Sequence, residues 1–237
     1  MEFTLLWSAL TGVTALYGSL WWMGRRDTSL CVRDLWEIAI TAGVVALATG
    51  RIVAMVRIGV NPFAHPGELL LVRAGVDTVG ATVGAVAATA WLARADLREQ
   101  LDGLGPAALF GLAGWHGGCL FRDACLGTPS SLPWAWAQPG SDITRHPVEL
   151  YAAVLMAVAA WLLFRLRLRY PVPGLVAALA LAAAGGARLI TEPFRPSLFA
   201  GPVWWYGAAL VGGIAIAVWA AVHPAATDTT DEVPPLL

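Results

Sequence analysis

The sequence predicts an all-α integral membrane protein that crosses the bilayer about seven times. Of the 237 residues, 58% are hydrophobic and 13% are charged, and the mean hydropathy is +0.66. Soluble domains contain about 45–50% apolar and about 25% charged residues. Apolar runs recur along the chain, and arginines are concentrated in alternate connections between them. Both patterns are typical of a polytopic membrane protein.

Seven apolar segments approach the length of about 20 residues that a helix needs to cross the hydrocarbon core. The first is expected to be an uncleaved anchor, because Arg25 and Arg26 end it and no small-residue cleavage site follows. The fourth is the weakest, because it is short, rich in glycine and contains His116. We expect the spans at about residues 4–23, 35–56, 76–93, 105–121, 147–164, 173–191 and 201–222.

The arginines predict how the chain is oriented in the membrane. Short connections rich in basic residues lie on the cytoplasmic side, so we expect the N-terminus outside and the C-terminus in the cytoplasm. Residues 1–222 would form a single transmembrane helical domain with an external loop at 122–146, and 223–237 a disordered cytoplasmic tail. The arginines that predict this orientation are Arg25, Arg26, Arg33, Arg94, Arg98, Arg165, Arg167 and Arg169.

Glycines and cysteines have mainly structural interpretations. Cys119 and Cys125 lack metal-ligand spacing, and we favour small apolar fillers over a disulfide, which would need an oxidising compartment. Gly117 and Gly118 could free backbone for a ligand. Small residues at helical spacing otherwise let helix backbones approach closely, and we expect this role for Gly43, Gly50, Gly75, Gly80, Gly84, Gly111, Gly114, Gly117 and Gly118.

Ionisable side chains occur inside or at the edges of the predicted spans. Each costs about 2.5–3.5 kcal/mol at the centre of a bilayer helix, so it needs a partner or a hydrated cavity. Arg188 and Glu192 are one helical turn apart and can contact each other. Arginines and carboxylates at one membrane depth suit an anionic phosphate head group, although an ion pair that only fixes helix packing is the alternative. The buried candidates are Arg51, Asp77, His116, Glu149, Arg188 and Glu192.

Four motifs resemble those of the prolipoprotein diacylglyceryl transferase family, in the same order. Residues 145–151, RHPVELY, resemble its signature RHPxQLYE, and residues 188–195, RLITEPFR, resemble its element R-I-x-x-E-F-x-R. Gly50–Ile52 resembles its G-G-R-I-G turn, and Leu132–Trp134 matches its L-P-W motif. The resemblance extends over about residues 5–222.

The resemblance implies a multi-pass enzyme of the bacterial plasma (inner) membrane. Such enzymes move a diacylglyceryl group from phosphatidylglycerol to the lipobox cysteine of a prolipoprotein, and glycerol-1-phosphate leaves. The implied partners are phosphatidylglycerol, the prolipoprotein signal peptide and membrane lipids, without nucleic acid, metal or soluble cofactor, and we expect a monomer. By this likeness, Arg188 holds the phosphate and Glu192 orients it. The expected substrate-binding residues are Arg51, Arg122, Asp123, Arg145, His146, Glu149, Tyr151 and Arg195.

Two positions depart from the family's pattern. Val79 stands where the third helix carries a histidine, and His116 stands where the central motif has an arginine. His116 is a candidate replacement for the missing imidazole, with Arg122 replacing the arginine; the alternative is a neutral histidine bonded within its own helix. We favour Asp77 as the partner of an arginine over an acid–base role.

Two other functional classes are alternatives to the transferase. One is a catalytically altered or inactive relative that binds an anionic phospholipid or assists a partner. The other is a small-solute transporter, which we disfavour because the charges lie near the external face and not at the midplane.

Overall fold

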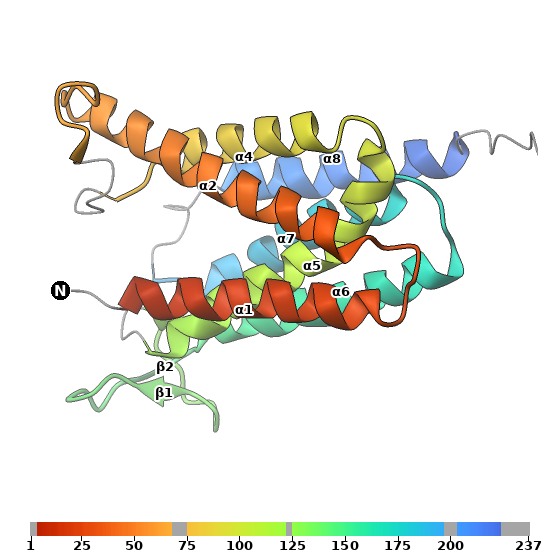
Figure 1. The fold of residues 1–237 in the computed structure, drawn as a ribbon. Coiled ribbons are helices and arrows are strands. Elements are labelled where there is room, and N and C mark those ends of the chain that lie inside the picture. Colours follow the sequence, from red (N-terminus) through yellow and green to blue (C-terminus); the bar gives the residue numbers. More distant parts are fainter. Residues whose placement is uncertain (1–3, 68–74, 122–124, 197–202, 224–237) are drawn as a thin grey trace, which may run out of the picture.

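The computed structural model describes residues 4–67, 75–121, 125–196 and 203–223, which form a bundle of long helices (Figure 1). The predicted all-α class is confirmed, and each predicted span corresponds to one long helix. The long helices in the described residues are α1 (Thr4–Gly24), α2 (Val32–Arg57), α4 (Thr78–Leu92), α5 (Leu97–Gly117), α6 (Val148–Arg169), α7 (Leu175–Thr191) and α8 (Val203–Val222). The short elements are η1 (Gly118–Phe121), β1 (Trp136–Ala137), β2 (Thr144–Arg145) and η3 (Glu192–Phe194).

Among the described residues, four helices are long and apolar enough to cross a membrane. They are α2, α6, α7 extended through η3, and α8, whereas α4 is a shorter apolar helix. Large apolar side chains face outward from the bundle, such as Val44 at 61%, Val86 at 62% and Val211 at 67% exposure. An outer surface of this kind is unfavourable in water and suits contact with lipid.

Close backbone contact holds the helices in pairs, α1 with α5, α2 with α4 and α7 with α8. The Thr11 hydroxyl donates to the Gly114 carbonyl (2.8 Å) across the first pair, and the Thr49 hydroxyl donates to the Gly80 carbonyl (2.9 Å) across the second. A Cβ on Gly213 would lie 2.6 Å from the Ala182 nitrogen, so only glycine fits between α7 and α8.

The predicted packing role therefore holds for most of the glycines. It is wrong for Gly43, Gly75 and Gly117, where an added Cβ would meet no described atom within 4 Å. Gly75 instead adopts a positive φ of 75° just before α4, a conformation that glycine takes without strain.

Asp77 and Asp102 both stabilise helix starts. Asp77 caps α4 by accepting from the Gly80 nitrogen (2.8 Å) and pairs with Arg57 (2.7 Å), which confirms its interpretation as an arginine partner. Asp102 accepts from the Gly174 and Ala177 nitrogens (both 2.7 Å) at the start of α7. It can do so because α5 begins at Leu97 and not near 105, since the hydropathy pattern marks only the apolar part of a helix.

The α5–α6 connection contains two features that the sequence analysis did not predict. β1 and β2 form a short antiparallel ladder in which Trp136 pairs with Arg145. Cys119 and Cys125 form a disulfide, with their Cα atoms 5.7 Å apart. The apolar-filler interpretation of these cysteines was therefore wrong.

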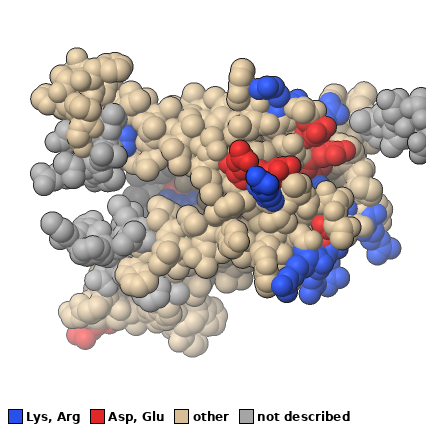
Figure 2. All heavy atoms as spheres, in the orientation of Figure 1, with Lys and Arg blue, Asp and Glu red and all other residues tan. Residues whose placement is uncertain are grey.

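Charged side chains gather mainly at one end of the described surface, on the right in Figure 2. The α1–α2, α4–α5 and α6–α7 connections lie at this end (Figure 1). Several arginines stack on aromatic rings there, including Arg25 over Trp21 (3.8 Å to the ring centroid) and Arg94 over Trp91 (4.7 Å). Stacked arginines at an aromatic belt are typical of a membrane–water interface.

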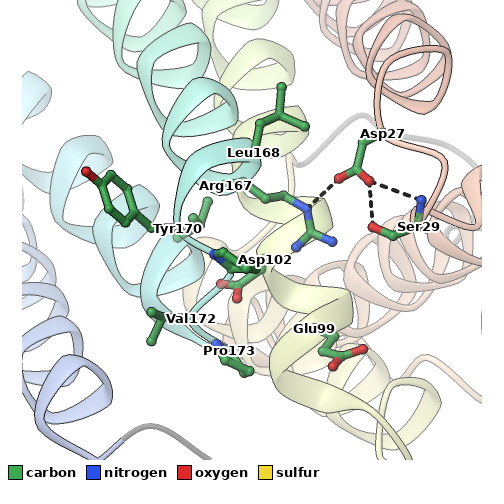
Figure 3. Close-up of a pocket in the computed structure, with 11 residues that line it drawn as sticks. Asp27, Ser29, Glu99, Asp102, Arg167, Leu168, Tyr170, Val172 and Pro173 are labelled. Atoms are coloured by element: carbon green, nitrogen blue, oxygen red, sulfur yellow. Dashed lines mark hydrogen bonds and ion pairs between the residues drawn. The ribbon is translucent and has the colours of Figure 1, made fainter. Parts of the chain in front are cut away.

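A cavity of about 360 Å³ at the same end contains an ion pair that joins α6 to the α1–α2 connection (Figure 3). The Arg167 guanidinium donates to Asp27 (3.0 Å), and the Ser29 amide (3.1 Å) and hydroxyl (2.5 Å) donate to the same carboxylate. Burial opposes ionisation of Asp27, but the hydrogen bonds from Ser29 and Arg167 outweigh it and hold the pKa of that carboxyl below its ordinary value.

The lowered pKa of Asp27 predicts an acid-sensitive contribution to stability. This contribution is fully present above the unfolded-state pKa and is lost as the pH falls through the lower folded-state pKa. Asp27→Asn should lower the free energy of unfolding at pH 7 by about 1–3 kcal/mol and flatten its dependence on pH below about 4. Denaturation of the detergent-solubilised protein between pH 3 and 7 measures both, with Asp96→Asn as the exposed control. An Asp27→Asn protein with the wild-type acid dependence would contradict the assignment.

Candidate active site

The ends of three helices meet opposite the arginine-rich end of the bundle. α5 ends at Gly117, α6 begins at Val148 and α7 ends at Thr191, and these ends lie on the same side of the molecule (Figure 1). Because neighbouring helices run antiparallel, residues far apart in sequence reach the same depth. The cluster of ionisable groups described below lies at this junction.

Glu149 is the centre of the cluster. Its Oε2 accepts from Arg188 Nη1 (3.0 Å) and contacts His116 Nδ1 (2.5 Å), and its Oε1 accepts from Arg195 Nη2 (2.9 Å). Glu149 lies in the first turn of α6, where the positive end of the helix dipole favours a carboxylate. One carboxylate therefore holds groups from α5, α7 and the turn after η3.

The side chains of the cluster are largely removed from solvent. The exposed fractions are 12% for Glu149, 14% for His116 and 10% for Arg188, against 29% for Arg195. Buried ions are tolerated only when they are paired, because each desolvated charge otherwise costs several kcal/mol. Arg195 is the more accessible of the two guanidinium groups, and is therefore the first that an anion entering the site would meet.

The predicted contact between Arg188 and Glu192 does not form. Arg188 points across the helix interface to Glu149, and its guanidinium also lies 5.4 Å from the ring centroid of Tyr206 in α8. Glu192 pairs instead with Arg195 at 3.5 Å. Burial opposes the charge on Arg195, but Glu149 and Glu192 outweigh it and raise the pKa of that guanidinium above its ordinary value.

Tyr151 of α6 contacts side chains of the segment that contains β1 and β2. Its hydroxyl accepts from Trp134 Nε1 (2.9 Å) and lies 3.3 Å from His146 Nδ1. The His146 ring packs on Phe194, with centroids 5.0 Å apart. These side chains line an open groove of about 640 Å³ that is otherwise mostly apolar and continues along α6 and α7 through Val154, Leu155 and Ile190.

Two further predicted site residues, Arg51 and Arg145, contact backbone carbonyls elsewhere in the described part of the chain. Arg51, which is 1% exposed, donates from Nη1 to the Gly75 carbonyl (2.7 Å) beside α4. Arg145 donates to the Gly127 carbonyl (3.1 Å). His116, Arg188 and Arg195 thus all contact the Glu149 carboxylate. Arg51 and Arg145 instead contact backbone carbonyls.

Arg122 and Asp123 lie outside the described residues, as does most of the predicted C-terminal tail, from residue 224 on. Val79, at the position of the family's histidine, is 48% exposed on α4.

Sequence reasoning placed Glu149 near Arg188 but missed its central role. The signal was present in the motif, since Glu149 occupies the position of the glutamine in RHPxQLYE and Ala152 that of the final glutamate. Ala152 is fully buried against the bundle. From position 149, one helical turn before Ala152, the carboxylate reaches two arginines and a histidine.

Several known proteins that resemble this chain share one name. Residues 1–204 match the sequence profile described as prolipoprotein diacylglyceryl transferase. A phosphatidylglycerol–prolipoprotein diacylglyceryl transferase of Methylibium petroleiphilum is 29% identical, over 90% of this chain and 91% of its own. Proteins of the same name from Rhodospirillum rubrum (29% identical over 81% of this chain and 76% of theirs) and Glaesserella parasuis (33% over 51% and 47%) are also similar. The Glaesserella match thus spans about half the length of that relative.

Proposed function

Because this chain belongs to the prolipoprotein diacylglyceryl transferase family and is therefore a membrane transferase of lipoprotein biosynthesis, we propose that it moves a diacylglyceryl group from phosphatidylglycerol to a prolipoprotein. The acceptor is the thiol of the lipobox cysteine. The observation that carries this proposal is the cluster of two guanidinium groups and an imidazole around Glu149, beside a largely apolar groove.

The cluster suits the charge changes of this reaction. The thiolate sulfur forms a bond to the terminal glycerol carbon of the diacylglyceryl group, and the bond from that carbon to the phosphate oxygen breaks. The electron pair moves to the leaving glycerol-1-phosphate, so negative charge increases on the phosphate. Guanidinium groups bind phosphate through paired N–H donors, and Arg188 and Arg195 are the two that we assign to this role.

The groove along α6 and α7 suits the lipid part of the substrate. It begins at Trp134, Tyr151 and Phe194, close to the cluster, and continues over aliphatic side chains that face outward. A phospholipid with its head group at Arg195 would place an acyl chain in this groove without removing it from the membrane. We assign His146 and Tyr151 to the groove's polar end, and Arg51 and Arg145 to shaping the external end of the site.

We further propose the seven-span topology, with residues 1–222 as one transmembrane domain, the N-terminus outside the plasma membrane and the C-terminus in the cytoplasm. The arginines that gather at one end of the bundle favour that end as the cytoplasmic side. The junction at Glu149 would then face the outer leaflet. An inactive relative that only binds anionic lipid is not favoured, because the similar proteins are named as transferases.

The cysteines test the orientation directly. Cys31 is exposed at the start of α2, at the arginine-rich end, while Cys119 and Cys125 are joined in a disulfide at the other end. A membrane-impermeant maleimide should not label spheroplasts that express the protein, and should label one thiol per chain after permeabilisation. Labelling of Cys31 in intact spheroplasts would reverse the proposed orientation. A Cys31→Ser protein, which should remain unlabelled in both conditions, is the control.

Growth of a transferase-depleted bacterium tests the function. Expression of the wild-type chain should restore growth, and the purified protein should transfer labelled diacylglyceryl from phosphatidylglycerol vesicles to a lipobox peptide. Asp142→Asn, which changes an exposed loop carboxylate, should behave as the wild type. Absence of both growth and transfer, with normal amounts of protein in the membrane, would contradict the proposal.

A further inference from the structure

The outward face of α6 continues beyond the apolar groove described above, as far as the arginine-rich end of the bundle. Exposed apolar side chains follow one another three or four residues apart along this face, and exposed arginines end the series. Residues at this spacing lie on the same face of a helix, so they form one outward stripe. The stripe contains Val154, Val158, Trp161, Leu162, Arg165 and Arg169.

A second groove, of about 450 Å³, lies at the arginine-rich end of this stripe. The described residues that line it all belong to α6, so it opens on the outer surface of the bundle and not between helices. Trp161 and Leu162 lie towards the middle of the helix, and the guanidinium groups lie near its end. We call this groove the basic groove, and it is lined by Trp161, Leu162, Arg165, Leu168 and Arg169.

The two arginines of the basic groove carry charge that no described carboxylate pairs with. Arg167, which lies between them in sequence, turns inward and pairs with Asp27 (3.0 Å). In the described part of the chain, no ion pair joins Arg165 or Arg169 to a carboxylate. Arg165 instead lies over the ring of Trp161 (5.0 Å to the centroid). Such a contact positions a guanidinium without consuming its N–H donors, which remain available to an anion.

The basic groove lies at the level of the lipid head groups in the topology proposed above. A helix rises about 1.5 Å per residue, so Arg169 is roughly 22 Å from Val154 along α6, against a hydrocarbon core about 30 Å thick. Val154 lines the apolar groove near the Glu149 cluster. The two grooves on α6 therefore open to opposite leaflets, and the basic groove opens to the cytoplasmic one.

We propose that the basic groove binds an anionic phospholipid of the cytoplasmic leaflet, at a site separate from the one that we assign to the reacting phosphatidylglycerol. The lipid phosphate accepts hydrogen bonds from Arg165 and Arg169, and one acyl chain lies along Trp161 and Leu162. A zwitterionic phospholipid has the same phosphate but also a cationic group, so the net charge of the head group is what the site selects. The inference does not rest on the transfer reaction, because none of these side chains belongs to the Glu149 cluster.

Lipid binding to the full-length protein in a mild detergent tests the site. Native mass spectrometry measures the affinity for dioleoylphosphatidylserine, which is anionic, and for dioleoylphosphatidylcholine, which is zwitterionic. The Arg165→Gln/Arg169→Gln protein should bind phosphatidylserine about 25-fold more weakly than the wild type, because each arginine near an anionic lipid contributes about fivefold in affinity. The affinity for phosphatidylcholine should be the same for both proteins. Circular dichroism checks that both are folded.

Two further double variants separate a local site from the general charge of this end. Arg165→Lys/Arg169→Lys keeps both charges but loses the paired donors of a guanidinium, and should lower the affinity for phosphatidylserine by no more than about fivefold. Arg25→Gln/Arg26→Gln removes two exposed arginines at the same end, which stack on Trp21 and Trp22 outside the basic groove. That variant should lower the affinity by less than about threefold.

The outcomes decide whether the groove is a lipid site. A folded Arg165→Gln/Arg169→Gln protein with the wild-type affinity for phosphatidylserine would overturn the proposal. An equal loss in the Arg25→Gln/Arg26→Gln protein would overturn it as well, because binding would then follow the charge of the whole end. The Glu149 cluster is intact in every variant, so any phospholipid bound there contributes equally to each measurement. A wild-type protein that transfers nothing would contradict the proposed function and leave this inference standing.

Discussion

Replacing Arg188 with alanine should lower the rate of diacylglyceryl transfer about 10²–10³-fold. Arg188 is 10% exposed and bonded to Glu149, so its guanidinium is already oriented before substrate arrives. An oriented donor stabilises developing charge on the phosphate without reorganisation during the reaction. Single-turnover transfer from phosphatidylglycerol to a lipobox peptide is the measurement, and the loss should appear in turnover more than in the phosphatidylglycerol KM.

Arg188→Lys and Arg94→Ala complete this experiment. The lysine variant should recover only part of the rate, because an ammonium group cannot form the paired hydrogen bonds of a guanidinium. Arg94 is exposed and stacks on Trp91 near the opposite end of the bundle, so its removal should leave the rate unchanged. If Arg188→Ala is folded and transfers at the wild-type rate, the phosphate is bound elsewhere, and the assignment of Arg188 fails.

Replacing Glu149 with alanine should lower stability by about 3–5 kcal/mol, the loss expected when one partner of a buried ion pair is removed. Without this carboxylate, Arg188 loses its ion-pair partner, and Arg195 keeps only the longer contact to Glu192. α5, α6 and α7 would lose the side chain that joins their ends. Urea denaturation of the protein in a mild detergent, followed by circular dichroism, measures the change.

Two further variants show whether uncompensated charge is the cause. Glu99→Ala removes an exposed carboxylate and should change stability by less than about 0.5 kcal/mol. Adding Arg195→Ala to Glu149→Ala removes one of the uncompensated cations, so the double variant should be more stable than the sum of the two single effects predicts. A Glu149→Ala loss of less than about 1 kcal/mol would mean that the ion pairs are hydrated and contribute little.

The cations that we assign to phosphate binding are held by a carboxylate that a phosphate must partly displace. Arg195 is the more exposed of the two and forms ion pairs with both Glu149 and Glu192. It can therefore turn towards an anion at a smaller cost in free energy than Arg188. We therefore expect Arg195→Ala to raise the phosphatidylglycerol KM more than it lowers turnover.

The sequence by itself predicted the helices and brought Glu149 and Arg188 to neighbouring helix ends, where the structure shows them in contact. Apolar length and arginine-rich connections are local properties, and each of the seven predicted spans corresponds to a helix in the structure. Depth follows from the position of a residue along its helix, and for this reason Glu149, Arg188 and Glu192 were expected at one level of the bundle. The motifs were sufficient to indicate the family, because they recur in order along the chain.

Only the tertiary structure decided which side chains meet. Arg188 bonds to Glu149, 39 residues away, and not to Glu192 one turn away; Cys119 and Cys125 are joined; and Arg51 turns to a backbone carbonyl beside α4. Such pairings depend on how far each helix is rotated about its axis and on which helix it packs against. The hydropathy of a segment indicates that it lies in the membrane, but it says little about how far the helix is rotated about its axis. Close contact between backbones at Gly114 and Gly213 fixes both the rotation of each helix and the helix against which it packs.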